Sequence, residues 1–250
     1  MTGLPARPAR TPEAIGGMSW QRAIVQRVRT HTLLKAASTV IAIAVFFAAY
    51  FWVLNHPVGA VRTMPALALD RWLDFEFATL PLYLSLWVYV SLGPALLPDR
   101  RALLAYGVAC LTLAAIGMTL FLFWPTRVPP LAADIAAQPG MLLLRGVDLS
   151  GNACPSLHVA FAVFAAAGLA RELRRIGAPR WLRALSVIWC AGIVYSTLAT
   201  RQHVVLDALA GALLGAAVAA VHVSWERGIA RRAAPDAAPP IRAGSAVGKP

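Results

Sequence analysis

A serine and a histidine stand where a polar stretch gives way to an apolar run, in GNACPSLHVAFAV, residues 151–163. Pro155 suits the first position of a helix, because its missing N–H is not needed there and its fixed φ helps the helix to start. The N–H groups of Ser156, Leu157 and His158 would then point out of the helix start, where the helix dipole also favours an anion such as phosphate. The Ser156 hydroxyl adds a donor, and His158 can exchange a proton near neutral pH. The alternative is a plain helix cap followed by a histidine at a membrane surface.

A second polar pair lies in STLATRQHVVLDALAG, residues 196–211. His203 and Asp207 are four residues apart, so on a helix they share one face, a turn apart. Asp207 lies in an apolar run, where an isolated carboxylate costs at least about 2.5 kcal/mol, so a partner is expected. A hydrogen bond from one ring nitrogen of His203 to Asp207 would fix the tautomer and direct the other nitrogen at a substrate. Two alternatives are a pair that only locks the helix and a metal site with His158, which lacks a supporting His or Cys cluster.

Two arginines complete the candidate chemistry. Arg127 lies in FWPTRVPPL, a stiff, proline-rich stretch that cannot be helical. A guanidinium held rigidly in this way suits bidentate phosphate binding, although an ordinary arginine at a membrane surface fits equally well. Arg201, two residues before His203, is a second cation with the same two interpretations.

The elements that position these residues are predicted to be membrane-spanning helices. Hydrophobic residues make up 59% of the 250-residue chain and charged residues only 14%, whereas a soluble domain carries about 25% charged residues. Several apolar runs approach or exceed the roughly 20 residues that cross a bilayer. The sequence therefore predicts an all-α, polytopic integral membrane protein with about six helices in one bundle and no soluble domain. The predicted helices cover residues 36–54, 77–98, 102–126, 155–173, 184–200 and 203–225.

The positive charge is distributed as the positive-inside rule expects. Of 23 Lys and Arg residues, 18 fall on one side of the six-helix scheme. Because Lys and Arg concentrate on the cytoplasmic side, both termini are expected in the cytoplasm of a bacterial inner membrane, and the site should face the periplasm. This pattern disfavours a nucleic-acid partner, despite the net charge of +12. The five cations on the far side are Arg62, Arg71, Arg127, Arg145 and Arg201.

The chain divides into three expected parts. Residues 1–30 form a basic cytoplasmic segment, 31–228 a six-helix catalytic domain, and 229–250 a disordered cytoplasmic tail. The loop from 131 to 149, with MLLL at 141–144, is expected to help select the substrate. The lone outer cysteine, Cys154, predicts no disulfide framework.

Charge counting thus places Arg127, Ser156, His158, Arg201 and His203 in one outer layer. A phosphate cradle, two histidines, an orienting carboxylate and two arginines suit phosphoryl transfer. No metal is needed in this scheme, since arginines and helix amides can carry the charge.

These residues resemble the type 2 phosphatidic acid phosphatase superfamily, whose motifs read K-x6-R-P, P-S-G-H and S-R-x5-H-x3-D. Here the second motif reads Pro155-Ser156-Leu157-His158, and the third reads Ser196-Thr197, five residues, His203, three residues and Asp207. Leu157 replaces the usual glycine, Thr197 replaces the arginine, and only Arg127 remains of the first motif. The P-S-L-H sequence is similar to the branch that contains inositol phosphorylceramide synthases.

The resemblance implies a role for each site residue. His203 would attack phosphorus to form a phosphohistidine, His158 would serve as the proton donor and then the base, and Asp207 would orient His203. The phosphoryl oxygens would be held by Ser156, by the backbone amides at the helix start around Leu157, and by the side chains of Arg127 and Arg201. Arg201 would take the place of the missing arginine. No metal or other cofactor is expected.

Three functions follow as hypotheses. The first is a phosphatase acting on lipid phosphates in the bilayer, for which no oligomer is required. The second keeps the chemistry but transfers a phospho-headgroup, of the inositolphosphoryl type, to a lipid alcohol. The third is a non-catalytic transporter or scaffold, in which the G-x3-G pair Gly211 and Gly215 would pack helices within one chain rather than between two.

Overall fold

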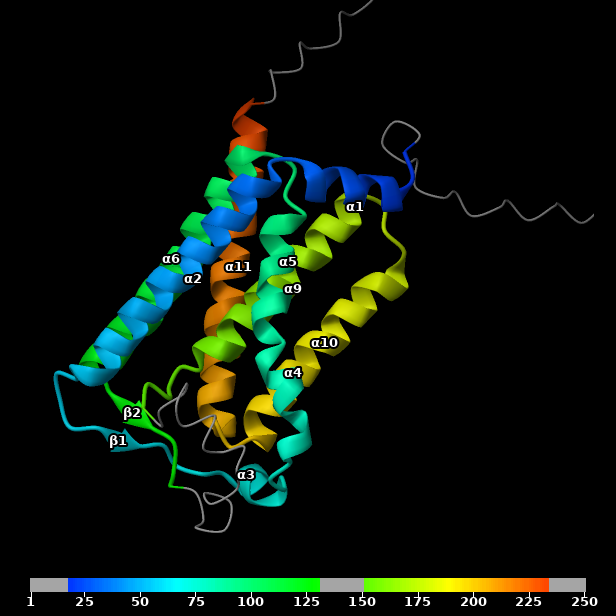
Figure 1. Cartoon of the computed structure of the whole chain (residues 1–250). Coiled ribbons are helices and arrows are strands. Elements are labelled where there is room, and N and C mark those ends of the chain that lie inside the picture. The colour runs from blue at the N-terminus through cyan, green and yellow to red at the C-terminus, as the bar shows by residue number, and fades with distance from the viewer. Residues whose placement is uncertain (1–17, 131–150, 234–250) are drawn as a thin grey trace, which may run out of the picture.

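The computed structural model describes residues 18–130 and 151–233. The predicted substrate loop at 131–149 lies outside the described residues, as do residues 1–17 and 234–250. The tail predicted to be disordered, 229–250, begins with five residues that belong to helix α11. Figure 1 shows a bundle of helices with two short strands and a small helix at one end. The elements are α1 (Trp20–Arg29), α2 (Thr32–Asn55), β1 (Arg62–Thr63), α3 (Ala68–Trp72), the 3-10 helix η2 (Phe77–Thr79), α4 (Leu80–Leu84), α5 (Leu86–Ala95), α6 (Arg100–Phe123), β2 (Thr126–Arg127), α9 (Leu157–Arg175), α10 (Arg180–Ala199) and α11 (Val205–Ala233).

Five helical spans in the described part are long and apolar enough to cross a membrane. They are Thr32–Asn55, Phe77–Ala95, Arg100–Phe123, Arg180–Ala199 and Val205–Ile229. This confirms the all-α, polytopic membrane class. The remaining predicted helix, 155–173, corresponds to α9. This helix is 19 residues long but ends in the charged sequence RELRR, so its composition is too polar for it to count among the five spans.

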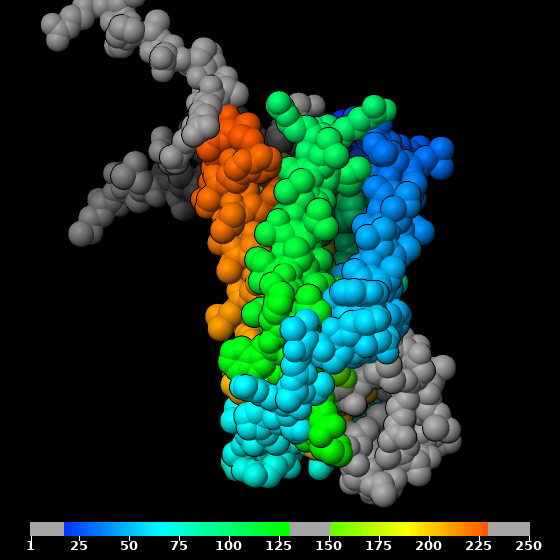
Figure 2. Space-filling model, turned by 90° about the vertical axis from the view of Figure 1, so that its left-hand side faces the viewer, coloured from blue at the N-terminus to red at the C-terminus, as the bar shows by residue number. Residues whose placement is uncertain are grey.

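Helix α9 crosses the middle of the bundle, where it packs against α5, α6, α10 and α11. Nine of its 19 residues are buried. This packing against neighbouring helices explains how a helix with charges at one end is kept inside an apolar bundle. Helix α6 lies at the periphery, and Figure 2 shows it between α11 and α2 along the length of the bundle. Its side chains Leu104, Val108 and Leu111 are more than 60% exposed. An apolar exposed surface of this kind suits contact with lipid chains.

Two glycines allow α11 to lie directly on the backbone of α9. A Cβ atom on Gly211 would come 2.2 Å from the carbonyl oxygen of Ser156, and one on Gly215 would come 2.3 Å from that of Ala160. The G-x3-G pair thus packs two helices of one chain, as the sequence favoured. Because the contact is made by backbone atoms, it brings the starts of α9 and α11 together at the same end of the bundle.

The two ends of the bundle differ in character. The end with His158 and His203, here called the site end, carries a parallel pair of strands in which Arg62 lies opposite Thr126 and Thr63 opposite Arg127. The segment leading into α9 is attached to this strand pair, because Gly151 pairs with Arg127 in an isolated antiparallel β-bridge. The site end also carries the short helix α3 (Figure 1).

The opposite end, here called the basic end, is held together by buried charge. Lys35 is only 4% exposed, and its ammonium donates to the carbonyl oxygens of Arg27, Ala95 and Leu97 at 2.6, 3.0 and 2.8 Å. The Arg27 side chain forms an ion pair with Glu172 of α9. These contacts fix α1 across the ends of α2, α5 and α9, so part of the predicted basic N-terminal segment is an ordered helix.

Replacing Gly211 with alanine should destabilise the protein, because the added methyl group would collide with the Ser156 carbonyl. Overpacking of this kind costs about 1–3 kcal/mol. We expect a lower melting temperature in detergent, measured by intrinsic fluorescence. Gly107→Ala in α6 is the matched control, since nothing lies within 4 Å of a Cβ at that position. Equal melting temperatures for Gly211→Ala and wild type would contradict the packing.

Candidate active site

Ser156 caps the start of α9. Its hydroxyl oxygen accepts a hydrogen bond from the N–H of Val159 at 3.2 Å, and its own N–H donates to the carbonyl oxygen of Asp207 at 2.9 Å. Pro155 therefore precedes the cap, and the prediction that it occupies the first helical position was wrong. The helix begins at Leu157, two residues later than a proline start requires, because Ser156 has an extended backbone and serves as the cap. Leu157 and His158 then supply the first-turn N–H groups that remain for an anion.

The side chain of Leu157, which replaces the glycine of the motif, packs against α6. It is 4% exposed, and a Cβ on Gly117 would lie 2.4 Å from its Cδ2 atom. The absence of a side chain at Gly117 makes room for the leucine. Leu157 can therefore occupy the glycine position without obstructing the start of α9.

His158 is oriented by Tyr83 of α4. Its Nε2 atom lies 3.1 Å from the Tyr83 carbonyl oxygen, and the two rings stack with centroids 4.1 Å apart and an angle of 13°. A carbonyl only accepts hydrogen bonds, so Nε2 carries the proton in this contact. Nδ1 is then the ring nitrogen left for proton exchange with a substrate.

His203 and Asp207 contact each other as predicted, but His203 lies two residues before α11, which begins at Val205, and so is not on the helix as expected. His203 Nδ1 lies 3.1 Å from Asp207 Oδ2, and the Asp207 side chain is fully buried, whereas that of His203 is 9% exposed. Since a carboxylate accepts, Nδ1 donates, and Nε2 is the ring nitrogen that does not contact Asp207. Asp207 lies in the first turn of α11, where the helix dipole stabilises its negative charge.

Both histidines line one cleft at the site end. Its walls are mainly apolar and aromatic and come from α2, α4, α5, α6 and α9, and its empty space is about 690 Å³ when the open solvent at its mouth is included. Tyr50, Tyr83, Trp87, Phe121, Phe161 and Asn152 are among the lining residues. A cleft that combines two histidines with aromatic walls can place a polar head on the histidines while apolar chains contact the rings.

Arg127 lies at the site end on β2, next to the entry to α9. Its Nε atom donates to the Thr63 hydroxyl at 3.1 Å, and its side chain is exposed. Thr126, the preceding residue, accepts from the Cys154 N–H at 2.8 Å through its own hydroxyl oxygen. The strand pair therefore ties Arg127 to the segment that leads into Ser156.

Arg201 has partners other than a phosphate. Its two terminal nitrogens donate to the backbone carbonyl oxygens of Asp70 and Leu73, in the segment around α3. Thr197, at the motif's arginine position, is fully buried and its hydroxyl donates to the carbonyl of Val194 at 2.7 Å. Among the arginines predicted to bind phosphate, Arg127 is therefore the exposed one.

Sequence reasoning missed three residues of this region: Asp70, Tyr83 and Asn152. Tyr83 lies in an ordinary apolar run, and nothing in its spacing links it to His158, 75 residues away. Asn152 holds a left-handed φ of 54° just before the cap, a conformation that asparagine tolerates better than most residues. The turn-forming sequence GNACP was the one available signal.

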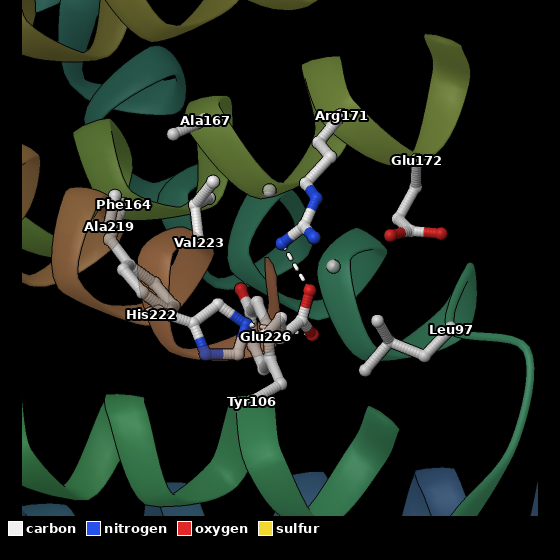
Figure 3. A pocket seen from close by; sticks show the side chains of 12 residues that line it. Leu97, Tyr106, Phe164, Ala167, Arg171, Glu172, Ala219, His222, Val223 and Glu226 are labelled. Atoms are coloured by element: carbon white, nitrogen blue, oxygen red, sulfur yellow. Dashed lines mark ion pairs between the residues drawn. The ribbon is translucent and has the colours of Figure 1, made fainter. Parts of the chain in front are cut away.

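A second polar pocket lies at the basic end, between α9 and α11. Figure 3 shows Arg171 of α9 facing Glu226 of α11, and these two form an ion pair. His222 Nε2 lies 3.4 Å from the other oxygen of Glu226, and Glu172 pairs with Arg27 and Arg175. Opposite charges thus pair throughout this pocket, which suits a link between helices. Within residues 18–130 and 151–233, no group of three or more His, Cys, Asp or Glu side chains is placed to hold a metal ion.

Comparison with known proteins gives one match. Residues 110–230 match the model of the PAP2 superfamily. The matched residues include α9, α10, most of α6 and nearly all of α11. No curated protein and no solved structure matches the chain. The matched region contains the start of α9 and the His203–Asp207 pair, and it supports the superfamily resemblance seen in the motifs, without distinguishing a branch.

Cys154, in the loop before α9, should react slowly with thiol reagents. Burial, and then the nearby Asp207 charge, raise the pKa of its thiol, so the reactive thiolate forms only at higher pH. In a protein with Cys110→Ala and Cys190→Ala, we expect the iodoacetamide rate to have its midpoint above the pH of about 8.5 typical of free cysteine. Asp207→Asn should move that midpoint down, because it removes one cause. A midpoint at or below 8.5 in the parent would contradict this electrostatic environment.

Proposed function

We propose that this chain, whose residues 110–230 match the PAP2 superfamily, is a membrane-embedded phosphatase of lipid phosphates that works through a phosphohistidine on His203. The observation that carries the proposal is the shared cleft: His158 and His203 both line it, and His203 is hydrogen-bonded to the fully buried Asp207. The family match supports phosphatase or phosphotransferase activity on lipid phosphates in general.

In the first half of the proposed reaction, Nε2 of His203 attacks phosphorus. A P–N bond forms and the bond from phosphorus to the lipid oxygen breaks, while protonated His158 gives a proton from Nδ1 to the leaving alkoxide. Asp207 holds the tautomer of His203 and stabilises the positive charge that its ring gains. The lipid alcohol leaves, and the phosphoryl group remains on His203.

In the second half, water attacks the phosphohistidine. His158, now neutral, takes the proton from the water through Nδ1, an O–P bond forms, and the P–N bond breaks to release inorganic phosphate. The N–H groups of Leu157 and His158, together with Arg127, bind the phosphoryl oxygens, whose charge is greatest in the transition state. His158 ends protonated and ready for the next substrate.

The cleft walls support a lipid rather than a soluble phosphate ester as the substrate. Phe46, Phe47 and Tyr50 of α2 line the same cleft as the histidines. Aromatic side chains at bilayer depth give acyl chains an apolar surface while the headgroup reaches the site end. The same apolar walls would admit a lipid alcohol in place of water, which keeps phospho-headgroup transfer as the second candidate.

The charge distribution supports an outward-facing site. Among the described residues, the Lys and Arg side chains that the positive-inside rule assigns to the cytoplasm belong to elements at the basic end. The starts of α9 and α11, next to which the two histidines stand, lie at the opposite end of the bundle (Figure 1). We propose that the substrate is a lipid of the outer leaflet of the inner membrane and that phosphate is released into the periplasm.

His203→Ala should abolish both phosphate release from lipid phosphates and acid-labile 32P labelling of the protein, because it removes the attacking nitrogen. His158→Ala should lower turnover by about 10²- to 10⁴-fold, the usual contribution of a general acid–base. Purified protein in detergent, screened against labelled phosphatidic acid and other lipid phosphates, gives both readouts. His56→Ala is the matched control, since His56 is exposed at the end of α2. Labelling that persists in His203→Ala would refute the mechanism.

Hydrolysis and transfer should separate when the acceptor is varied. With phosphatidylinositol labelled in its headgroup and ceramide as the acceptor, hydrolysis yields a water-soluble label, whereas transfer yields a new labelled lipid. We expect the water-soluble product to dominate. No turnover of any lipid phosphate by wild type would instead favour a transporter or scaffold.

A further inference from the structure

The segment around α3 is joined to the connection between α10 and α11 by four backbone-directed contacts. The Glu76 N–H donates to the Ala199 carbonyl oxygen at 3.0 Å, and the Val205 N–H donates to Asp70 Oδ1 at 2.8 Å. The Arg201 guanidinium donates to the carbonyl oxygens of Asp70 and Leu73. Residues 199–205, which lead into α11, are therefore held from outside by a segment more than 120 residues earlier in the chain.

Asp70 is the centre of these contacts. It is only 4% exposed, and its carboxylate accepts from two sides, from the Leu67 N–H through Oδ2 at 2.7 Å and from the Val205 N–H through Oδ1. Val205 is the first residue of α11, where N–H groups lack partners within the helix. Asp70 thus caps α11 from a distant part of the chain, and a negative charge there is also favoured by the helix dipole.

The capped position lies between the two members of the proposed catalytic pair. His203 stands two residues before Val205 and Asp207 two residues after it. A shift of the Val205 backbone would therefore move the His203 ring relative to both the cleft and Asp207. The hydrogen bond from the Ser156 N–H to the Asp207 carbonyl links the same turn to α9.

Arg201 supplies the second part of the connection. Its backbone holds a left-handed φ of 57°, a conformation that costs a non-glycine residue of order 1–3 kcal/mol and is kept only when its surroundings fix it. The two hydrogen bonds from its side chain to the α3 segment fix it. The chain can therefore turn sharply at Arg201 and present His203 immediately afterwards.

We propose that Asp70 and Arg201 are positioning residues, which set the location of the His203 ring by fixing the start of α11 and do not contact the substrate. This proposal rests on the proposed phosphohistidine chemistry of His203. It assigns to Arg201 a role in geometry rather than in phosphate binding, and it adds Asp70 to the residues on which turnover depends.

Asp70→Asn tests the proposal with little change in volume. The carboxylate accepts from two N–H groups, those of Leu67 and Val205. The amide of asparagine has only one oxygen to accept from them, and its NH₂ group would face the other N–H, so one hydrogen bond is lost. We expect kcat to fall by about 10- to 100-fold, the effect of a displaced reacting group, with KM within about two-fold of wild type. Hydrogen exchange of peptides covering 200–207 should become faster, while exchange in α9 stays unchanged.

Asp74→Asn is the matched control, because it removes the same charge four residues later at an exposed side chain and should leave kcat and exchange as in wild type. Arg201→Lys is a second variant, which keeps the charge but cannot span both carbonyl oxygens. It should lower kcat with little change in KM, whereas loss of a phosphate ligand would raise KM and make it sensitive to salt.

Each outcome decides something. Unchanged exchange at 200–207 in Asp70→Asn overturns the connection itself, and faster exchange with unchanged kcat overturns the positioning role. The exchange measurement needs no substrate, so a wild type without activity would refute the proposed function while leaving the structural part of the proposal decided by exchange. If Asp70→Asn does not fold, Arg201→Lys gives the same two readouts.

Discussion

The close packing of α9 on α11 is the contact on which the candidate site depends. Gly211 and Gly215 face the carbonyl oxygens of Ser156 and Ala160 so closely that a Cβ atom would come within 2.2 and 2.3 Å of them. Only hydrogen at these two Cα positions lets the helices approach, since the carbonyl groups belong to the helix backbone and cannot turn away. The same approach places the Ser156 N–H 2.9 Å from the Asp207 carbonyl oxygen. The start of α9, which carries His158, and the start of α11, which follows His203, are thereby held in one layer.

Burial determines how the His203–Asp207 pair behaves. Asp207 is fully buried, and its Oδ1 atom has no hydrogen-bond partner in the described part of the chain. The carboxylate is therefore stabilised mainly through its Oδ2 atom, which accepts the hydrogen bond from His203. In a medium of low polarity a carboxylate interacts more strongly with a neighbouring positive charge than it would in water. In the proposed mechanism, the positive charge that the His203 ring would gain on attacking phosphorus is therefore favoured by the same carboxylate that fixes the ring. The first turn of α11 offsets part of the cost of burying Asp207.

The parts of this site that were predictable are those that depend on local spacing. The spacing of four between His203 and Asp207 suffices to predict their contact, although His203 lies two residues before α11 and not on it. The apolar composition suffices for the membrane class. Pro155 was misplaced because the cap is Ser156, whose extended backbone and contact with Asp207 of α11 are not visible in the local sequence. Asp70 was missed for the same reason: in LALDRWLDF it looks no different from Asp74. Its importance comes from Val205, 135 residues away, and no periodicity reports such a pairing.

The two ends of the bundle are stabilised by different kinds of contact, and the difference suits their proposed roles. At the basic end, arginines pair with Glu172 and Glu226, and these pairs link helices while the end as a whole stays rich in Lys and Arg. At the site end, Arg201 instead binds two backbone carbonyl oxygens. Ion pairs between side chains hold helices together, whereas hydrogen bonds to carbonyl oxygens fix the path of the backbone itself. Arg201 therefore fixes the backbone next to His203, and in the proposed mechanism the phosphate is bound by Arg127 and the first N–H groups of α9.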